Sequence, residues 1–98
     1  MHRIVERPKA QQDLDGIADY IAADNPEAAR KVIGAVADTY KHLAEWPEMS
    51  QLLADGFRMI PVIGFRQYLV LYLCHDMTVE ILRVIRADQD YRRILFVE

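Results

Sequence analysis

The sequence predicts an α+β fold: an N-terminal strand, an antiparallel two-helix hairpin packed on an antiparallel β-sheet of about four strands, and a short C-terminal helix. Apolar residues recur at helical spacing in the first half of the chain, and from Phe57 onward the period changes to that of strands. The length of 98 residues suffices for a core without disulfides or metal, so we expect residues 1–98 to form a single domain.

The first elements are a short strand and a helix. The string HRIVER favours a strand, and Pro8 suits the first turn of a helix because that position needs no backbone N–H. The helix carries an apolar stripe at helical spacing, formed by Ala10, Leu14, Ile17 and Ile21. Its opposite face carries Asp13, Asp15 and Asp19.

A second helix follows directly. The string DNP ends the first helix, Asn25 is a suitable N-cap for the next, and Glu27 suits the positive end of its dipole. The apolar face of this helix consists of Ala29, Val32, Ile33, Val36, Tyr40 and Leu43. The helix is expected to end at Pro47, and Trp46 to close the hairpin as a core residue. Because the connection is short, the two helices should pair antiparallel.

Three strands are predicted in the strings FRMIPV, FRQYLVLYLC and MTVEILRVIR. Pro61 cannot donate to a ladder, which favours a sheet edge or a bulge for the first strand. In the second strand one face carries Leu69, Leu71 and Leu73, and we expect these leucines to lie under the helices. Neither face of the third strand is clearly apolar, so its register stays open. The string DQDYRRIL then favours a short helix capped by Asp88.

Positive charge in the second half of the chain comes from arginine alone. The net charge is −3, yet residues 51–98 hold six acidic and six basic side chains, and every basic one is an arginine. Arginine pairs bidentately with carboxylate or phosphate, so these residues predict a recognition surface, although solvation of a sheet face is an open alternative. The overall acidity argues against direct nucleic-acid binding.

The sequence contains no enzyme signature by itself. Neighbours in the string CHD, residues 74–76, point apart on a strand and cannot form a relay. Asp15 and Asp19 lack a histidine at ligand spacing, and the glycines are too scattered for a phosphate loop. We therefore expect neither a metal ion nor a cofactor.

Localisation is read from three features. No segment reaches the roughly 20 apolar residues of a membrane helix. The N-terminus lacks the order of a secretory signal, and a single cysteine, Cys74, cannot form an internal disulfide. These features favour the cytoplasm and no membrane partner.

Four strings, in this order and spacing, resemble the ParE branch of the RelE/ParE toxins of bacterial toxin–antitoxin modules: AQQDLDGIADYIAADNPEAA, LAEWPEMS, GFRQYLVLY and VEILRVIRADQDYRRIL. The resemblance implies a helix hairpin on an antiparallel sheet. It also implies growth arrest by the toxin and a short cognate antitoxin that wraps and neutralises it. Whether the free toxin is a dimer or occurs only in a toxin–antitoxin hetero-oligomer stays open.

Two activities occur among proteins of this kind. RelE-like members cut messenger RNA in the ribosome with basic residues and often a C-terminal Tyr or His. Anchored on Tyr72, that pattern puts Leu69 and Ala87 where arginines would be needed. ParE-like members instead poison DNA gyrase by binding, and are similar in carrying Arg66 in a GFR context and a charged C-terminal segment.

The resemblance therefore implies a gyrase inhibitor that acts by binding, with no catalytic residue. The target- or antitoxin-binding residues are then expected to be Arg58, Arg66, Arg83, Arg86, Tyr91, Arg92 and Arg93. A ribosome-dependent mRNA endonuclease and a non-toxic, toxin-derived protein-binding domain remain as alternatives.

Overall fold

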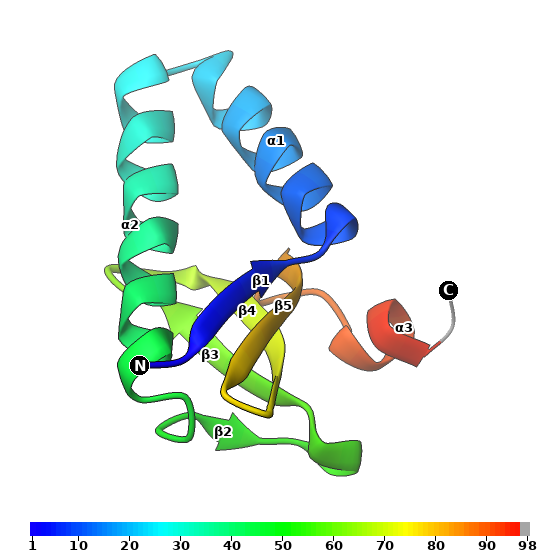
Figure 1. The fold of residues 1–98 in the computed structure, drawn as a ribbon. Helices are drawn as coiled ribbons and strands as arrows, with labels where there is room; N and C mark the ends of the chain where they lie inside the picture. Colours follow the sequence, from blue (N-terminus) through cyan, green and yellow to red (C-terminus); the bar gives the residue numbers. More distant parts are fainter. Residues whose placement is uncertain (97–98) are drawn as a thin grey trace.

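The computed structural model describes residues 1–96 (Figure 1). The elements in chain order are β1 (Arg3–Glu6), α1 (Pro8–Ala22), α2 (Pro26–Glu45), β2 (Gln51–Leu52), the 3-10 helix η1 (Ala54–Gly56), β3 (Arg58–Val62), β4 (Phe65–His75), β5 (Thr78–Arg86) and α3 (Tyr91–Phe96). Within the described residues, no helix is long and apolar enough to cross a membrane.

The two long helices form as the sequence predicts. Pro8 opens α1, and the side chain of Asn25 caps α2 by accepting the backbone N–H of Ala28 at 3.1 Å. In Figure 1 the helices run antiparallel and meet at a turn that lies away from the sheet. The hairpin extends past the end of the sheet. One face of α1 therefore lies opposite the start of β4 and the end of β5.

The sheet is mixed and has five strands, in the order β1-β5-β4-β3-β2. The predicted fold class is confirmed, with two differences of detail: the sheet has five strands rather than about four, and one strand pair is parallel. The strand β1 pairs parallel with β5, as Figure 1 shows for the blue and yellow arrows. Between β1 and β2 the helices α1 and α2 carry the chain from one edge of the sheet to the other. The strand β2 has only two residues, too few for a periodic pattern.

The core lies between the helices and one face of the sheet. Leu14, Val36 and Leu43 pack there against Val70 and Tyr72 of β4. The expectation that Leu69, Leu71 and Leu73 lie under the helices was wrong, because these leucines occupy the other face. Both alternating sets of β4 are rich in apolar residues, so alternation alone does not select the buried face.

The face of the sheet that carries Leu69, Leu71 and Leu73 lies beside the C-terminal helix α3. Leu73 and Leu82 of the sheet, together with Phe57, Ile94 and Leu95, line a groove of about 520 Å³ beside α3. Phe57 also contacts Phe96 edge-to-face, with ring centroids 5.3 Å apart. The short helix α3 therefore lies on the opposite side of the sheet from α1 and α2.

A bulge in β5 explains why its register stayed open. Leu71 faces Arg83 while its neighbour Tyr72 faces Ile81, which leaves Leu82 as the extra residue. Ile81 and Val84 therefore both join the core although they lie three residues apart. The register between β3 and β4 shifts between Pro61 and Val62, which agrees with a bulge, one of the two alternatives predicted for Pro61.

The end of α2 differs from the expectation. Pro47 is buried at this position, whereas Trp46 is 52% exposed. The prediction that Trp46 closes the hairpin core was therefore wrong. The backbone of Trp46 caps the helix by donating to the carbonyl of His42 at 2.9 Å, and its ring is left near solvent.

Candidate functional site

The predicted site residues fall into two groups. Arg58 and Arg83, the inward arginines, have side chains only 16% and 18% exposed. The outward arginines are exposed and comprise Arg66, Arg86, Arg92 and Arg93. The structure therefore does not bring all the predicted residues into one site.

Arg83 is held by the first helix. Its Nε donates to Oδ2 of Asp13 at 2.8 Å and its Nη2 donates to Oδ1 at 2.9 Å, a bidentate pair. The carboxylate also accepts the backbone N–H of Val84 at 3.0 Å. Asp13 is only 16% exposed, so it joins α1 to β5 rather than facing solvent with the other aspartates.

Arg58 is held by the segment that follows α2. Its Nη1 donates to the carbonyl oxygens of Glu48 and Ser50, each at 3.3 Å. Tyr72 supports the same segment, because its hydroxyl donates to the carbonyl of Pro47 at 2.6 Å and also contacts the Ser50 hydroxyl. Burial raises the pKa of Tyr72. These polar groups are used within the fold.

Arg66 and Arg86 lie at the same end of the sheet. Arg86 is directly opposite Tyr68, and Arg66 precedes Tyr68 by two residues, so all three share the face toward the helices. Arg86 contacts Asp88 at 3.2 Å, but with side chains 63% and 76% exposed this pair is weak. Arg66 forms no hydrogen bond or ion pair with any of residues 1–96. Both guanidinium groups are accessible to a partner.

The remaining predicted residues belong to α3. Asp90, not Asp88 as predicted, caps this helix by accepting the N–H of Arg92 at 3.0 Å, because the Asp88 side chain contacts Arg86 instead. The guanidinium carbon of Arg92 lies 5.8 Å from the ring centroid of Tyr91. Arg92 and Arg93 thus form a second exposed basic region on the other side of the sheet.

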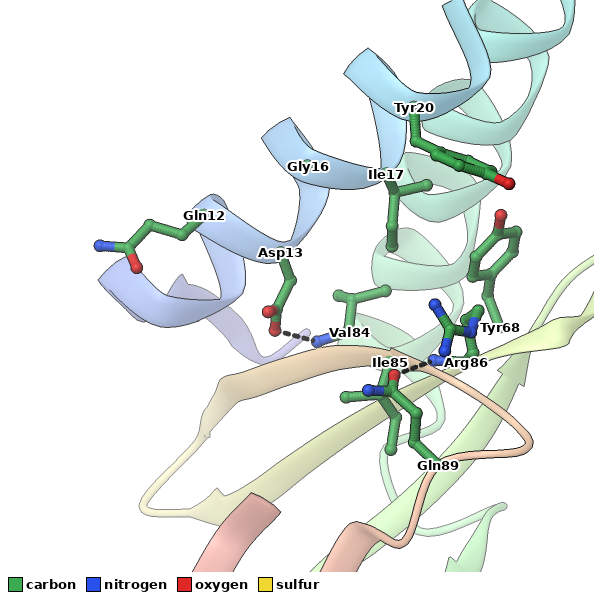
Figure 2. Close-up of a pocket in the computed structure, with 10 residues that line it drawn as sticks. All are labelled: Gln12, Asp13, Gly16, Ile17, Tyr20, Tyr68, Val84, Ile85, Arg86 and Gln89. Atoms are coloured by element: carbon green, nitrogen blue, oxygen red, sulfur yellow. Dashed lines mark hydrogen bonds between the residues drawn. The ribbon is translucent and has the colours of Figure 1, made fainter. Parts of the chain in front are cut away.

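Arg86 lines a groove of about 500 Å³ between α1 and the ends of β4 and β5. In Figure 2 its side chain rises beside Tyr68, and Tyr20 of α1 reaches toward Tyr68 from above. Tyr20 is 83% exposed. The groove has room at Gly16, where an added Cβ would meet nothing within 4 Å.

Sequence reasoning missed Gly16, Tyr20 and Gln89, which also line this groove. The one available signal was a glycine inside a helix, a position that usually disfavours the helix and so has a packing or functional reason. Nothing in the pattern associates that glycine with strands more than 50 residues away.

The polar groups of the groove differ in how far they are already bonded. Its carboxylate, Asp13, is already bonded to Arg83 and to the N–H of Val84. Across residues 1–96, no three His, Cys, Asp or Glu side chains gather closely enough to hold a metal ion. The groove offers a guanidinium group at Arg86, the phenol rings of Tyr20 and Tyr68, and an apolar side chain of α1 at Ile17.

Comparisons with known proteins agree with this fold. A family model described as the ParE toxin of type II toxin–antitoxin system, parDE, matches residues 4–91. A chain of the chromosomal ParDE toxin–antitoxin system from P. aeruginosa is similar with a TM-score of 0.75 and 23% identity, over 90% of this chain and 98% of that one.

A second similar structure is the conserved hypothetical protein HP0894 from Helicobacter pylori, with a TM-score of 0.60 and 17% identity, over 91% of this chain and 98% of that one. No curated protein sequence matches the chain. The two structures support the fold, and the family match spans most of the sequence. The chain therefore belongs to the ParE toxins of type II toxin–antitoxin systems.

Proposed function

We propose that this ParE-family protein inhibits DNA gyrase by binding it, performs no covalent chemistry, and is neutralised by a cognate antitoxin. The observation that carries the proposal is the difference between Tyr72 and the outward arginines. Tyr72, the tyrosine on which an RNase alignment would rest, is fully buried, while Arg66 and Arg86 are exposed and Arg86 lines an open groove. Groups arranged in this way can hold a partner.

The competing mRNA endonuclease activity has less support. Cleavage of a phosphodiester needs cationic groups at the developing phosphate charge and an accessible acid or base. The two positions where such an enzyme would use arginine hold Leu69 and Ala87. The C-terminal tyrosine that could serve such an enzyme as acid or base is Tyr91, and it would act without the arginines that these two positions lack.

The outward arginines are the proposed contact residues for gyrase and for the antitoxin. Both partners can present carboxylates, which pair well with guanidinium groups. The sequence also predicted Arg58 and Arg83 as contact residues. Because their guanidinium groups are already bonded within the protein, we propose that they hold the fold in shape and do not contact a partner. We further propose that the chain acts as one domain in the cytoplasm without a cofactor.

A paired assay tests this function. The purified protein is added to DNA gyrase in supercoiling and DNA-cleavage reactions, and separately to ribosomes programmed with messenger RNA. Loss of supercoiling with accumulation of cleaved DNA, and intact messenger RNA, is the expected result. Ribosome-dependent cuts with normal gyrase activity would establish the endonuclease alternative instead. A folded protein that is inactive in both assays and harmless when overproduced would indicate a non-toxic binding domain.

A further inference from the structure

The outer edge of β5 changes its partner halfway along the strand. As far as Ile81 it is paired with β1, and the N–H of Arg7 donates to the Ile81 carbonyl at 2.9 Å. From Leu82 to Arg86 no other strand of the described chain lies beside this edge. Side chains take the place of the missing strand there.

Two backbone N–H groups on this edge are capped by side chains. Val84 and Arg86 are alternate residues, so both N–H groups point away from β4. The N–H of Val84 donates to Asp13 at 3.0 Å and that of Arg86 donates to Oε1 of Gln89 at 2.9 Å, the two dashed lines in Figure 2. The N–H of Gln89 in turn donates to the carbonyl of Arg86 at 3.1 Å. Gln89 thus imitates one residue of a neighbouring strand.

These caps can be exchanged for a real strand. A partner's main chain would supply the same acceptor and donor groups, so the edge would keep its full set of hydrogen bonds. Asp13 would give up only its bond to Val84 and would keep both bonds to Arg83. The 500 Å³ groove runs beside the capped residues and provides the space.

Charge indicates the kind of segment that fits. Arg86 lies on the capped edge, and its contact with the exposed Asp88 is weak. The carboxylate of Asp13, which lines the groove, is already bonded to Arg83. An acidic side chain on the added strand would meet the guanidinium group of Arg86. Its apolar neighbours would contact Ile17 and the exposed ring of Tyr20.

We propose that the β5 edge from Val84 to Arg86 binds an extended acidic segment of a partner protein, which pairs with it as an added strand and displaces Gln89. The inference deepens the proposed function and rests on it for the view that the outward arginines meet a protein. A second copy of this chain is the competing occupant.

The test uses a synthetic peptide of alternating glutamate and valine, with blocked ends, added to the folded protein. Amide hydrogen exchange and NMR shifts are followed for Val84 and Arg86. We expect exchange at both amides to slow by at least about tenfold at saturation. A lysine–valine peptide and a backbone N-methylated glutamate–valine peptide should have no effect. Protection by the N-methylated peptide, or no protection by the glutamate peptide, would overturn the proposal.

Substitutions at Gln89 and Arg86 distinguish a residue that caps the β5 edge from one that contacts the peptide. Gln89→Ala removes the competing acceptor, so the peptide should bind several-fold more tightly, whereas Arg86→Ala should weaken binding about tenfold. Gln51→Ala is the matched control, because Gln51 is exposed on β2 at the other edge of the sheet and does not line this groove. Weaker binding by Gln89→Ala, with the melting temperature retained, contradicts the proposed displacement.

Three further outcomes are distinguishable. Protection of Val84 and Arg86 that rises with protein concentration in the absence of peptide would assign the edge to a second copy and overturn the proposal. Gyrase inhibition without peptide binding would overturn only the added strand. Peptide binding with protected amides but no effect on gyrase would leave the added strand standing and refute the gyrase target.

Discussion

Arg83 and Arg86 lie three residues apart on the same strand, and they have opposite situations. Arg83 is 18% exposed and bonded through both sides of its fork to Asp13. Arg86 is 63% exposed, and its one ionic contact is with an exposed neighbour. The difference teaches that the role of an arginine on this sheet depends on whether another element brings a carboxylate to it. The inward arginines hold elements of the fold together, and the outward arginines are accessible to a binding partner.

The largest effect should come from breaking the inward pair. Arg83→Ala leaves the Asp13 carboxylate largely buried without its cation, and we expect the free energy of unfolding to fall by about 3 kcal/mol. Urea denaturation measures this decrease. Arg86→Ala is the matched control and should change stability by less than about 0.5 kcal/mol. Equal decreases for the two variants would contradict the division into inward and outward arginines.

Partner binding should show the reverse order. Arg86→Ala and Arg66→Ala should each weaken gyrase inhibition or antitoxin binding by about 1.5–3 kcal/mol if the arginine pairs bidentately with a partner carboxylate, with melting temperature retained. Arg30→Ala on α2, where an exposed arginine pairs only with Glu27, should leave both activities unchanged. If all three variants were equally toxic, the outward arginines would no longer be candidates for the contact surface.

An inward tyrosine extends the comparison to alkaline pH. The Tyr40 hydroxyl donates to Oε2 of Glu6 at 2.7 Å, and burial together with this bond raises the pKa of Tyr40 well above its usual value. The neutral tyrosine is therefore favoured in the folded state, so its contribution to stability is complete below about pH 10 and declines above it as the unfolded chain ionises. The decline should be about 1 kcal/mol per pH unit. Tyr40→Phe should reduce this slope in denaturation measured from pH 9 to 11, whereas Tyr20→Phe, at an exposed ring, should not.

The smallest effect is expected at the exposed pair. Asp88→Asn removes the ionic contact with Arg86, and stability should change by no more than about 0.5 kcal/mol. Partner binding should be retained or slightly improved, because the guanidinium of Arg86 is then free of competition. Markedly weaker binding on titration of the Asp88→Asn protein would show that Asp88 positions Arg86.

Local features of the fold were predictable because they depend on neighbours in sequence. The cap at Asn25, the start of α1 at Pro8 and the bulge at Pro61 each follow from the chemistry of one or two residues. The three long strands also followed from their apolar period.

Features that depend on distant residues were not predictable. The bulge at Leu82 interrupts the alternation of β5, so no single face could be recognised. The partner of Arg83 is Asp13, 70 residues earlier in the chain, and spacing gives no sign of that contact. The sequence identified the arginines as a set, but only the fold separates those that are bonded internally from those that are accessible.

The parallel pairing of β1 with β5 has a consequence for how the protein is made. Residues 3–6 are synthesised well before their partners, residues 78–81, so β1 has no neighbouring strand until β5 has been made. Such long-range pairing slows folding, because the chain between the strands must be closed into a loop first. The edge of β5 and the exposed Arg86 at its end are therefore completed late, after translation has passed β5.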